Sequence, residues 1–334
     1  MDHAPVIWLP AIRAGSGADV YTERLAGGLL GRGIDVKVTW FHHFMELVPY
    51  FLKYTKLPAG TDIIHTNSWN GFAFKRKDTK LIVTVHHCVS DPEYQSYKSM
   101  MQAAYHDLLI NRYEAHSIQT ADCVVAVSKY TADKVQSLFN ITQVRVIYNG
   151  IDTDYFSPGD TRKKPARFRL LFVGNPTRRK GFDLLRPIVE KLGGEYELFY
   201  TGSPGKMPFV KQANVHATGI LQKDDLLQAY RDCDAMLFPS RLEGFGYSVC
   251  EAMACGKPVI TSDNSSLSEI IRHGETGLLC KTDNVDEFCA AARLLASDPV
   301  LAEKMGKAAR VHVMENFTLG KMVDEYTRLY KSIL

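Results

Sequence analysis

The stretch RLEGFGYSVCEAMACGKPVITS, residues 241–262, has the pattern of a tight turn, a helix and a buried strand in direct succession. Its glycines permit the turn, and the apolar spacing that follows predicts a helix over residues 247–255. The start of such a helix leaves the backbone N–H groups near Tyr247 and Ser248 outside the helical ladder, with a partial positive charge. Phosphate is a natural ligand of that arrangement. The stretch therefore predicts a parallel α/β unit with an anion site where its helix begins.

The same stretch carries two glutamates, Glu243 before the turn and Glu251 about one turn into the helix. The Glu251 carboxylate can accept hydrogen bonds from a pair of vicinal hydroxyls, such as those of a ribose. Two glutamates at this spacing are a weak signal by themselves. The alternative is that Glu243 is a turn residue and Glu251 a solvated helix residue.

Outward from this stretch, short apolar runs alternate with helix-length amphipathic segments along the whole chain, which predicts βαβ units and parallel sheets. The strands are expected at residues 5–9, 35–40, 62–66, 81–86, 122–127, 145–148, 169–173, 196–200, 214–217, 235–238, 258–261 and 277–280. The helices are expected at residues 20–32, 181–192, 224–232, 247–255, 285–297, 299–315 and 319–334. Parallel sheets of this kind bind ligands at the carboxyl ends of their strands.

A chain of 334 residues is long for one hydrophobic core and suits two domains of about 150 residues each. The predicted fold class is α/β, with two doubly wound parallel-sheet domains. A polar stretch with two prolines separates the two series of strands, so it is predicted to be a linker. The expected boundaries are 1–152 for the first domain, 153–167 for the linker, 168–316 for the second domain and 317–334 for a helix that follows the second sheet.

The composition is that of a globular protein, with 46% hydrophobic and 23% charged residues and a net charge of +3. That balance gives no nucleic-acid footprint. The seven cysteines are odd in number and form no C-x-x-C pair, which argues against a disulfide framework and a zinc site. No charged leader precedes an apolar segment, and no apolar run has the length of a membrane span. A reducing cytoplasm is the expected location.

Residues 243–260 resemble, almost letter for letter, the E-x7-E signature of the retaining glycosyltransferases of family 4, also called group 1. The resemblance extends to VRVIYNGID (144–152), LLFVGNPTRRKGFDLL (170–185), NVHATGILQKDDLLQAYRDCDAMLFPS (214–240) and ENFTLGKMVDEYTRLYKSIL (315–334). It implies the GT-B fold, in which two Rossmann-like domains face each other across a cleft and a final helix crosses back to the first domain. The motifs identify the family far better than the substrate.

The resemblance implies a role for each residue of the second domain that lies in a family motif. Glu243 would bind hydroxyls of the donor sugar and Glu251 the ribose, while Lys180 would hold the diphosphate. Arg178 or Arg179 would take the place of the family's phosphate arginine, because Asn175 stands where many members have it. The remaining donor-binding residues would be Gly174, Gly219, Phe245, Gly246, Tyr247 and Ser248.

Fixed positive charge beside a departing diphosphate is the physical reason for an arginine and a lysine in this loop. The alternative is that Arg178, Arg179 and Lys180 form a solvated charged turn. If the implied roles hold, loss of Glu251 would weaken binding of the free nucleotide. Loss of Glu243 would weaken binding of the sugar-bearing donor alone.

In the first domain, the loop RAGSGADVY stands where the family has its glycine-rich loop. Gly15 and Gly17 could let the backbone approach the donor diphosphate or the acceptor there. In VTVHHC, His86 stands where the family has its catalytic-site histidine, which is thought to support the donor sugar rather than act as the base. The alternative is a core histidine, and that interpretation is preferred for His87.

The function expected from this resemblance is retaining transfer of a sugar, with His86, Glu243, Arg179 and Lys180 as catalytic residues. The donor would be a nucleoside-diphosphate sugar, with UDP favoured over GDP and ADP. The acceptor would be a hydroxyl of a sugar, a lipid-linked or a small molecule, in glycan, polysaccharide or glycolipid assembly. No metal and no further cofactor are expected. A phosphorylase on the same scaffold and a non-catalytic nucleotide-sugar-binding protein are the alternatives.

Two segments of the first domain bear on its partners. Residues 41–56 are rich in aromatic residues and contain lysines, and residues 75–77 add a basic patch. Amphipathic basic segments can lie on an anionic membrane face, so peripheral contact with the inner face of a membrane is one interpretation. The same apolar residues could instead line an acceptor groove or fill the core.

Overall fold

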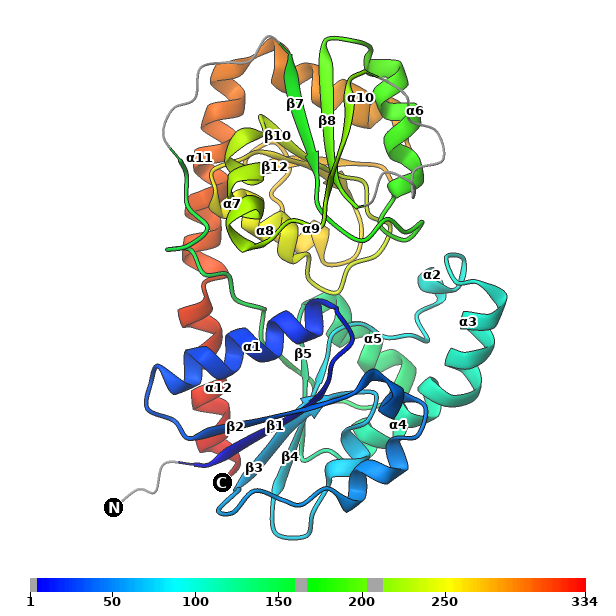
Figure 1. The fold of residues 1–334 in the computed structure, drawn as a ribbon, viewed down its shortest axis with the longest axis vertical. Coiled ribbons are helices and arrows are strands. Elements are labelled where there is room, and N and C mark those ends of the chain that lie inside the picture. Colours follow the sequence, from blue (N-terminus) through cyan, green and yellow to red (C-terminus); the bar gives the residue numbers. More distant parts are fainter. Residues whose placement is uncertain (1–4, 160–166, 203–212) are drawn as a thin grey trace. The chain divides into compact units, whose positions relative to one another are not determined.

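The computed structural model describes residues 5–159, 167–202 and 213–334. The chain divides into two compact units (Figure 1). Unit 1 comprises the residues up to Gly150 together with Leu319–Leu334, and unit 2 comprises Ile151–Thr318. Residues 160–166 of the expected linker lie outside the described residues. Each unit contains one six-stranded sheet, and every strand pairs in parallel with its neighbours.

The sheet of unit 1 has the strand order β2-β1-β3-β4-β5-β6. The chain order of neighbouring strands reverses between β1 and β3, although all the strands are parallel. Its central strands are buried on both faces, as parallel strands between two helix layers should be. The strands are β1 (Ile7–Ile12), β2 (Val36–Phe41), β3 (Ile63–Asn67), β4 (Lys80–Val85), β5 (Cys123–Ala126) and β6 (Arg145–Val146).

The helices of unit 1 include several that the sequence pattern did not predict, all between residues 43 and 139. The α-helices are α1 (Gly17–Leu30), α2 (Pro92–Gln95), α3 (Met100–Tyr105), α4 (Asn111–Thr120), α5 (Lys129–Phe139) and α12 (Leu319–Ile333). Three 3₁₀ helices, η1 (His43–Glu46), η2 (Pro49–Tyr54) and η3 (Gly71–Phe74), and a π-helical turn, η4 (His106–Ile110), complete the unit.

Helices α1 and α12 lie side by side although about 290 positions separate them in the chain (Figure 1). They approach most closely at Gly28, where an added Cβ would lie 2.4 Å from Cγ2 of Val323. Arg32 secures the same face by donating to the Asp324 carboxylate at 2.8 Å. The glycine therefore sets the distance between the two helices.

A buried polar cluster ties α12 to the sheet of unit 1. The Tyr330 hydroxyl lies 2.7 Å from Nδ1 of His65, and Nε2 of His65 lies 2.7 Å from the Thr84 hydroxyl. The Tyr326 hydroxyl lies 3.2 Å from Thr84, and the Tyr21 hydroxyl of α1 lies 3.3 Å from His65. Because polar groups buried in a core need hydrogen-bond partners, α12 is a structural part of unit 1.

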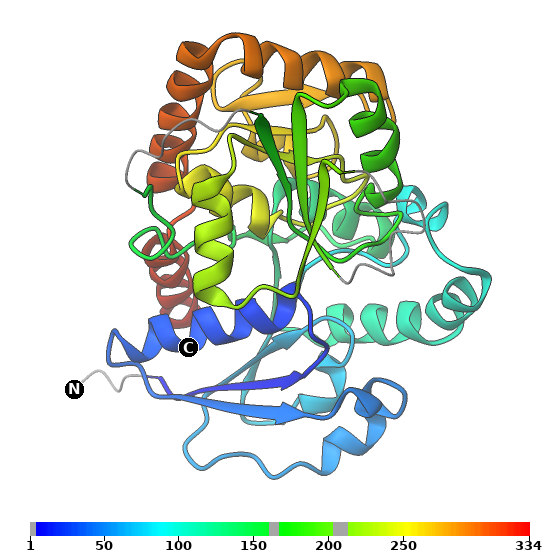
Figure 2. The same ribbon diagram turned by 45° about the horizontal axis from the view of Figure 1, so that its top comes forward.

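The sheet of unit 2 has the strand order β12-β11-β10-β7-β8-β9. The chain order of neighbouring strands reverses between β10 and β7, although the two strands are parallel. Helices α10 and α11, drawn in orange in Figure 2, pack against this sheet at β11 and β12. The strands are β7 (Phe168–Phe172), β8 (Tyr196–Thr201), β9 (Val215–Gly219), β10 (Ala235–Phe238), β11 (Val259–Ser262) and β12 (Gly277–Cys280). The helices are η5 (Phe182–Leu184), α6 (Leu185–Leu192), α7 (Lys223–Asp232), α8 (Tyr247–Ala254), α9 (Leu267–Ile270), α10 (Val285–Ser297) and α11 (Pro299–Asn316). The predicted fold class, α/β with two doubly wound parallel sheets, is confirmed.

Candidate active site

The candidate site in unit 2 lies at the carboxyl ends of β7 and β10, the neighbouring strands between which the sheet order reverses. Ligands of doubly wound sheets bind at such switch points. The loop after β7 meets the loop after β10 at Gly181, whose φ is +69° and whose added Cβ would lie 1.9 Å from the Pro239 carbonyl oxygen. Only glycine permits this contact, and the contact brings Lys180 to Glu243.

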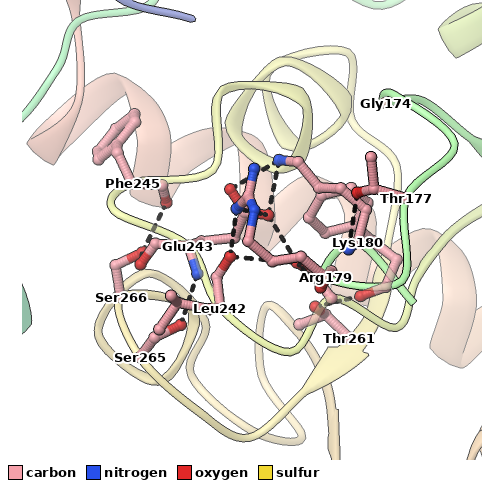
Figure 3. Close-up of polar contacts among 12 residues, drawn as sticks. Gly174, Thr177, Arg179, Lys180, Leu242, Glu243, Phe245, Thr261, Ser265 and Ser266 are labelled. Carbon is pink, nitrogen blue, oxygen red and sulfur yellow. Dashed lines mark hydrogen bonds and ion pairs between the residues drawn. The ribbon is translucent and has the colours of Figure 1, made fainter. Parts of the chain in front are cut away.

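Lys180, Arg179 and Glu243 form one hydrogen-bonded charge cluster (Figure 3). The Lys180 ammonium donates to both carboxylate oxygens of Glu243, at 2.6 and 2.8 Å. The Ser240 hydroxyl donates to Oε1 of the same carboxylate at 2.6 Å. Arg179 Nη1 donates to the Leu242 carbonyl at 2.6 Å and lies 3.7 Å from Oε1 of Glu243. The cluster therefore joins two cations and one anion from both loops.

The cluster is largely shielded from solvent, with side-chain exposures of 28% for Arg179, 17% for Lys180 and 7% for Glu243. Burial by itself raises the pKa of Glu243, but the charges of Lys180 and Arg179 outweigh it, so that pKa lies below its ordinary value. Burial lowers the pKa of Lys180, while the attraction of Glu243 opposes that shift. Arg178, by contrast, is exposed, so the structure places Arg179 in the cluster.

Arg241 connects the loop after β10, in which it lies, to the loop after β7. Its side chain is 4% exposed and binds both oxygens of Asp183 at 2.7 and 2.9 Å, as well as Asp283 at 2.6 Å. It also donates to the Arg178 carbonyl, and its own backbone N–H donates to the Arg179 carbonyl at 2.8 Å. Sequence analysis assigned no role to Arg241, since its partners lie 42 and 58 positions away.

Helix α8 begins beside the charge cluster. Gly246 precedes its first residue with a φ of +98°, which lets the chain turn sharply from the buried Phe245 into the helix. Tyr247 and Ser248 form the first turn and are half-buried. The positive end of the helix dipole therefore lies in the loop that carries Glu243, four positions after that residue.

Glu251 lies one turn into α8 and is buried. Its Oε2 accepts a hydrogen bond from the hydroxyl of Tyr230 in α7 at 3.0 Å. Tyr230 is fully buried, and burial together with the Glu251 charge raises its pKa well above the ordinary value. Glu251 is thus not a solvated helix residue, and Tyr230 orients its carboxylate.

Four of the five glycines expected to bind the donor differ in what their backbone groups already do. The Gly174 N–H donates to the Thr201 hydroxyl at 2.9 Å, and the Gly219 carbonyl accepts from Gly202 at 3.0 Å. In unit 1, the Gly15 N–H donates to the Asp19 carboxylate at 2.8 Å. Gly17 is the first residue of α1 and not part of the loop, because Ser16 caps the helix there.

His86 follows β4 in unit 1. Its Nε2 lies 3.0 Å from the Asn67 side-chain oxygen, and its ring meets Tyr21 edge-on with the centroids 4.8 Å apart. Burial lowers the pKa of His86 to about 4, so the imidazole is neutral near pH 7. The neighbouring His87 instead contacts the rings of Trp69 and Tyr94.

Within the described parts of the chain, no three His, Cys, Asp or Glu side chains come together as metal ligands. The same described residues contain no helix that is long and apolar enough to cross a bilayer.

Comparison with solved structures identifies the class of fold. Sucrose-phosphate synthase from Thermosynechococcus elongatus superposes with a TM-score of 0.82, at 21% identity, over 98% of each chain. Anabaena HepE, solved in complex with UDP and glucose, superposes with a TM-score of 0.71, at 18% identity, over 98% of this chain and 100% of that one. Two Rossmann-like units of this kind define the GT-B fold, which this chain shares.

Family models extend the assignment from fold to family. Residues 156–312 match the glycosyl transferases group 1 model, and residues 40–155 match the glycosyltransferase family 4 model. The chain belongs to the group 1, family 4 glycosyltransferases. An uncharacterized glycosyltransferase of Methanocaldococcus jannaschii is 29% identical over 62% of this chain and 59% of its own length. The match thus spans less than two thirds of that relative.

Proposed function

We propose that this chain is a retaining glycosyltransferase that moves a sugar from a nucleoside-diphosphate sugar, UDP-sugar in the first instance, to an acceptor hydroxyl. The observation that carries the proposal is the cluster of Arg179, Lys180 and Glu243 beside the start of α8. Two cations and a helix dipole opposed by one carboxylate leave net positive charge where a diphosphate can bind. The HepE structures with UDP support the choice of nucleotide.

The transfer step breaks the bond between the anomeric carbon and the diphosphate oxygen, and the electron pair goes to the phosphate. Arg179 and Lys180 would stabilise the charge that develops there. The acceptor oxygen forms the new bond on the same face, and its proton passes to the departing phosphate oxygen. Glu243 is bound by Lys180 and Ser240, so it suits the task of positioning sugar hydroxyls better than that of a free nucleophile.

Two further parts of the proposal concern the metal and His86. Protein cations take the role that a divalent ion has in other sugar transferases, so turnover should persist in excess EDTA. A neutral His86 could accept or donate one hydrogen bond to the donor sugar without acting as an acid near pH 7. The proposed reaction would form a glycosidic bond during glycan, polysaccharide or glycolipid assembly, a role that is consistent with the family.

A screen of nucleotide sugars by thermal shift, followed by UDP release and NMR of the product's anomeric proton, tests the proposal. Lys180→Ala should lower kcat at least 30-fold, because a phosphate contact of about 2–4 kcal/mol is lost. Arg178→Ala is the matched control, since its side chain is exposed outside the cluster, and it should keep its rate within about threefold.

Three outcomes would contradict the proposal. Donor binding without turnover with any acceptor would favour a non-catalytic nucleotide-sugar-binding protein. Turnover that requires inorganic phosphate as the sugar acceptor would favour a phosphorylase. An inverted product would exclude the retaining route.

A further inference from the structure

The segment between β2 and β3 in unit 1 turns aromatic side chains to solvent. We call five of its residues the aromatic patch, with exposures of 56% for Phe44, 49% for Leu47, 55% for Tyr50, 64% for Phe51 and 74% for Tyr54. Pro49 and Leu52 of the same segment are buried and fix it to the core. A helix on the surface of a water-soluble unit normally presents a polar outer face, and this segment presents an apolar one.

A rim of three exposed lysines, Lys53, Lys56 and Lys77, accompanies the aromatic patch, and Asp78 is exposed directly after Lys77. Arg76 Nη2 donates to the Lys53 carbonyl at 2.8 Å and to the Thr55 carbonyl at 3.1 Å, which fixes the basic turn 75–77 beside η2. Glu46 is the only acidic residue of the sequence 42–56. The surface therefore combines exposed aromatic rings with positive charge.

We propose that the aromatic patch and its basic rim form a docking surface for an anionic lipid membrane. Phenylalanine and leucine side chains gain free energy by leaving water for the acyl region, and tyrosine rings favour the headgroup level. The lysines attract anionic headgroups while their stems follow the apolar surface. The surface belongs to unit 1 alone, and it stands on exposure and charge, independently of the proposed transferase function.

The charges distinguish a membrane from a protein partner of apolar character. An apolar protein surface needs no positive rim, whereas anionic headgroups lie directly around any ring that enters the bilayer surface. The η1–η2 segment is also short, so it would lie at the interface and not span it.

Sedimentation with vesicles of phosphatidylglycerol and phosphatidylcholine in about equal parts tests the proposal, with pure phosphatidylcholine vesicles as the neutral comparison. The unmodified chain should bind the mixed vesicles and release at high salt. Lys53→Gln with Lys77→Gln should weaken binding about 20- to 30-fold, since each charge near an anionic surface contributes about fivefold. Phe51→Ser with Tyr54→Ser should weaken it at least about tenfold.

Val300→Ser with Val311→Ser is the matched control, because these unit 2 side chains are 77% and 54% exposed and lie outside the patch. It should bind vesicles like the unmodified chain. UDP binding should be unchanged in every variant, which separates this test from that of the transferase function. Absence of vesicle binding by the unmodified chain, equal binding to neutral vesicles, or equal binding by the patch variants and the control would overturn the proposal. Self-association through the patch in place of vesicle binding would overturn it as well.

Discussion

Glu243 and Glu251 lie eight positions apart, yet their carboxylates have different partners. Lys180 and Ser240 hold Glu243, whereas Tyr230 holds Glu251. The first glutamate lies against the proposed phosphate lysine and the second against a neutral hydroxyl. Removing each should therefore affect nucleotide binding in opposite ways.

Glu243→Ala should bind free UDP no more weakly than the unmodified chain, because the lost carboxylate competes with phosphate for Lys180. Its kcat should still fall at least about 30-fold, since Lys180 loses the partner that positions it. Glu251→Ala should weaken UDP binding about tenfold or more, as expected for a hydrogen bond to a charged group. Calorimetry with UDP measures both effects.

Tyr230→Phe is the control for the second variant. It keeps the ring in the core and removes only the hydroxyl that orients Glu251, so UDP binding should weaken less than in Glu251→Ala. Equal UDP affinity in all three variants would mean that neither glutamate lies at the nucleotide.

Sequence motifs singled out Arg179, Lys180 and Glu243 as neighbours in a site, but they gave no reason to select Ser240, Arg241 or Tyr230. The difference is physical. A sequence motif identifies residues that are close together in the chain. Arg241 instead forms ion pairs with Asp183 and Asp283, which are far away in the sequence and reach it only in the folded protein.

At the scale of elements, the strands were predictable because buried parallel strands are continuous apolar runs. Helices α4 and α5 were not predicted. The buried face of α5 consists of Thr131, Ala132 and Val135, which are small and include one hydroxyl. The short η1 and η2 lack the length over which a period can be recognised.

The contact between α1 and α12 gives a prediction that two adjacent glycines can test. Gly28→Ala should destabilise unit 1 by about 1–3 kcal/mol, since the new methyl group would overlap the stiff side chain of Val323. Gly27→Ala should stabilise it by up to about 1 kcal/mol, because its Cβ meets nothing within 4 Å and alanine favours the helix.

Urea unfolding followed by tryptophan fluorescence measures these changes. All three tryptophans, Trp8, Trp40 and Trp69, belong to unit 1, so the signal reports on that unit alone. Equal midpoints for the two alanine variants would show that α12 does not pack against α1 in solution.

At the scale of the whole molecule, the stability of unit 1 should depend on pH through the buried His65 and the half-buried His86. Burial lowers the pKa of His65 to about 3 and that of His86 to about 4, below the ordinary value of about 6.5 in an unfolded chain. The unfolded chain then binds more protons below pH 6.5, so stability is lost as pH falls through that value.

Each of these histidines should contribute a loss of up to about 1.4 kcal/mol per pH unit between pH 6 and pH 4.5. The same tryptophan fluorescence measures the free energy of unfolding at each pH. His65→Gln should reduce the slope by about one proton, whatever its effect on stability at pH 7. A slope equal to that of the unmodified chain would show that His65 is accessible to protons in the folded state.

The return of α12 to unit 1 has a consequence for how the protein is made. Residues 319–334 leave the ribosome only after all of unit 2 has been synthesised, yet Tyr326 and Tyr330 complete the polar core around His65. Unit 1 therefore emerges first and is finished last. While unit 2 is being translated, the core of unit 1 lacks α12 beside α1. Folding of unit 1 can therefore be completed only after unit 2 has been synthesised.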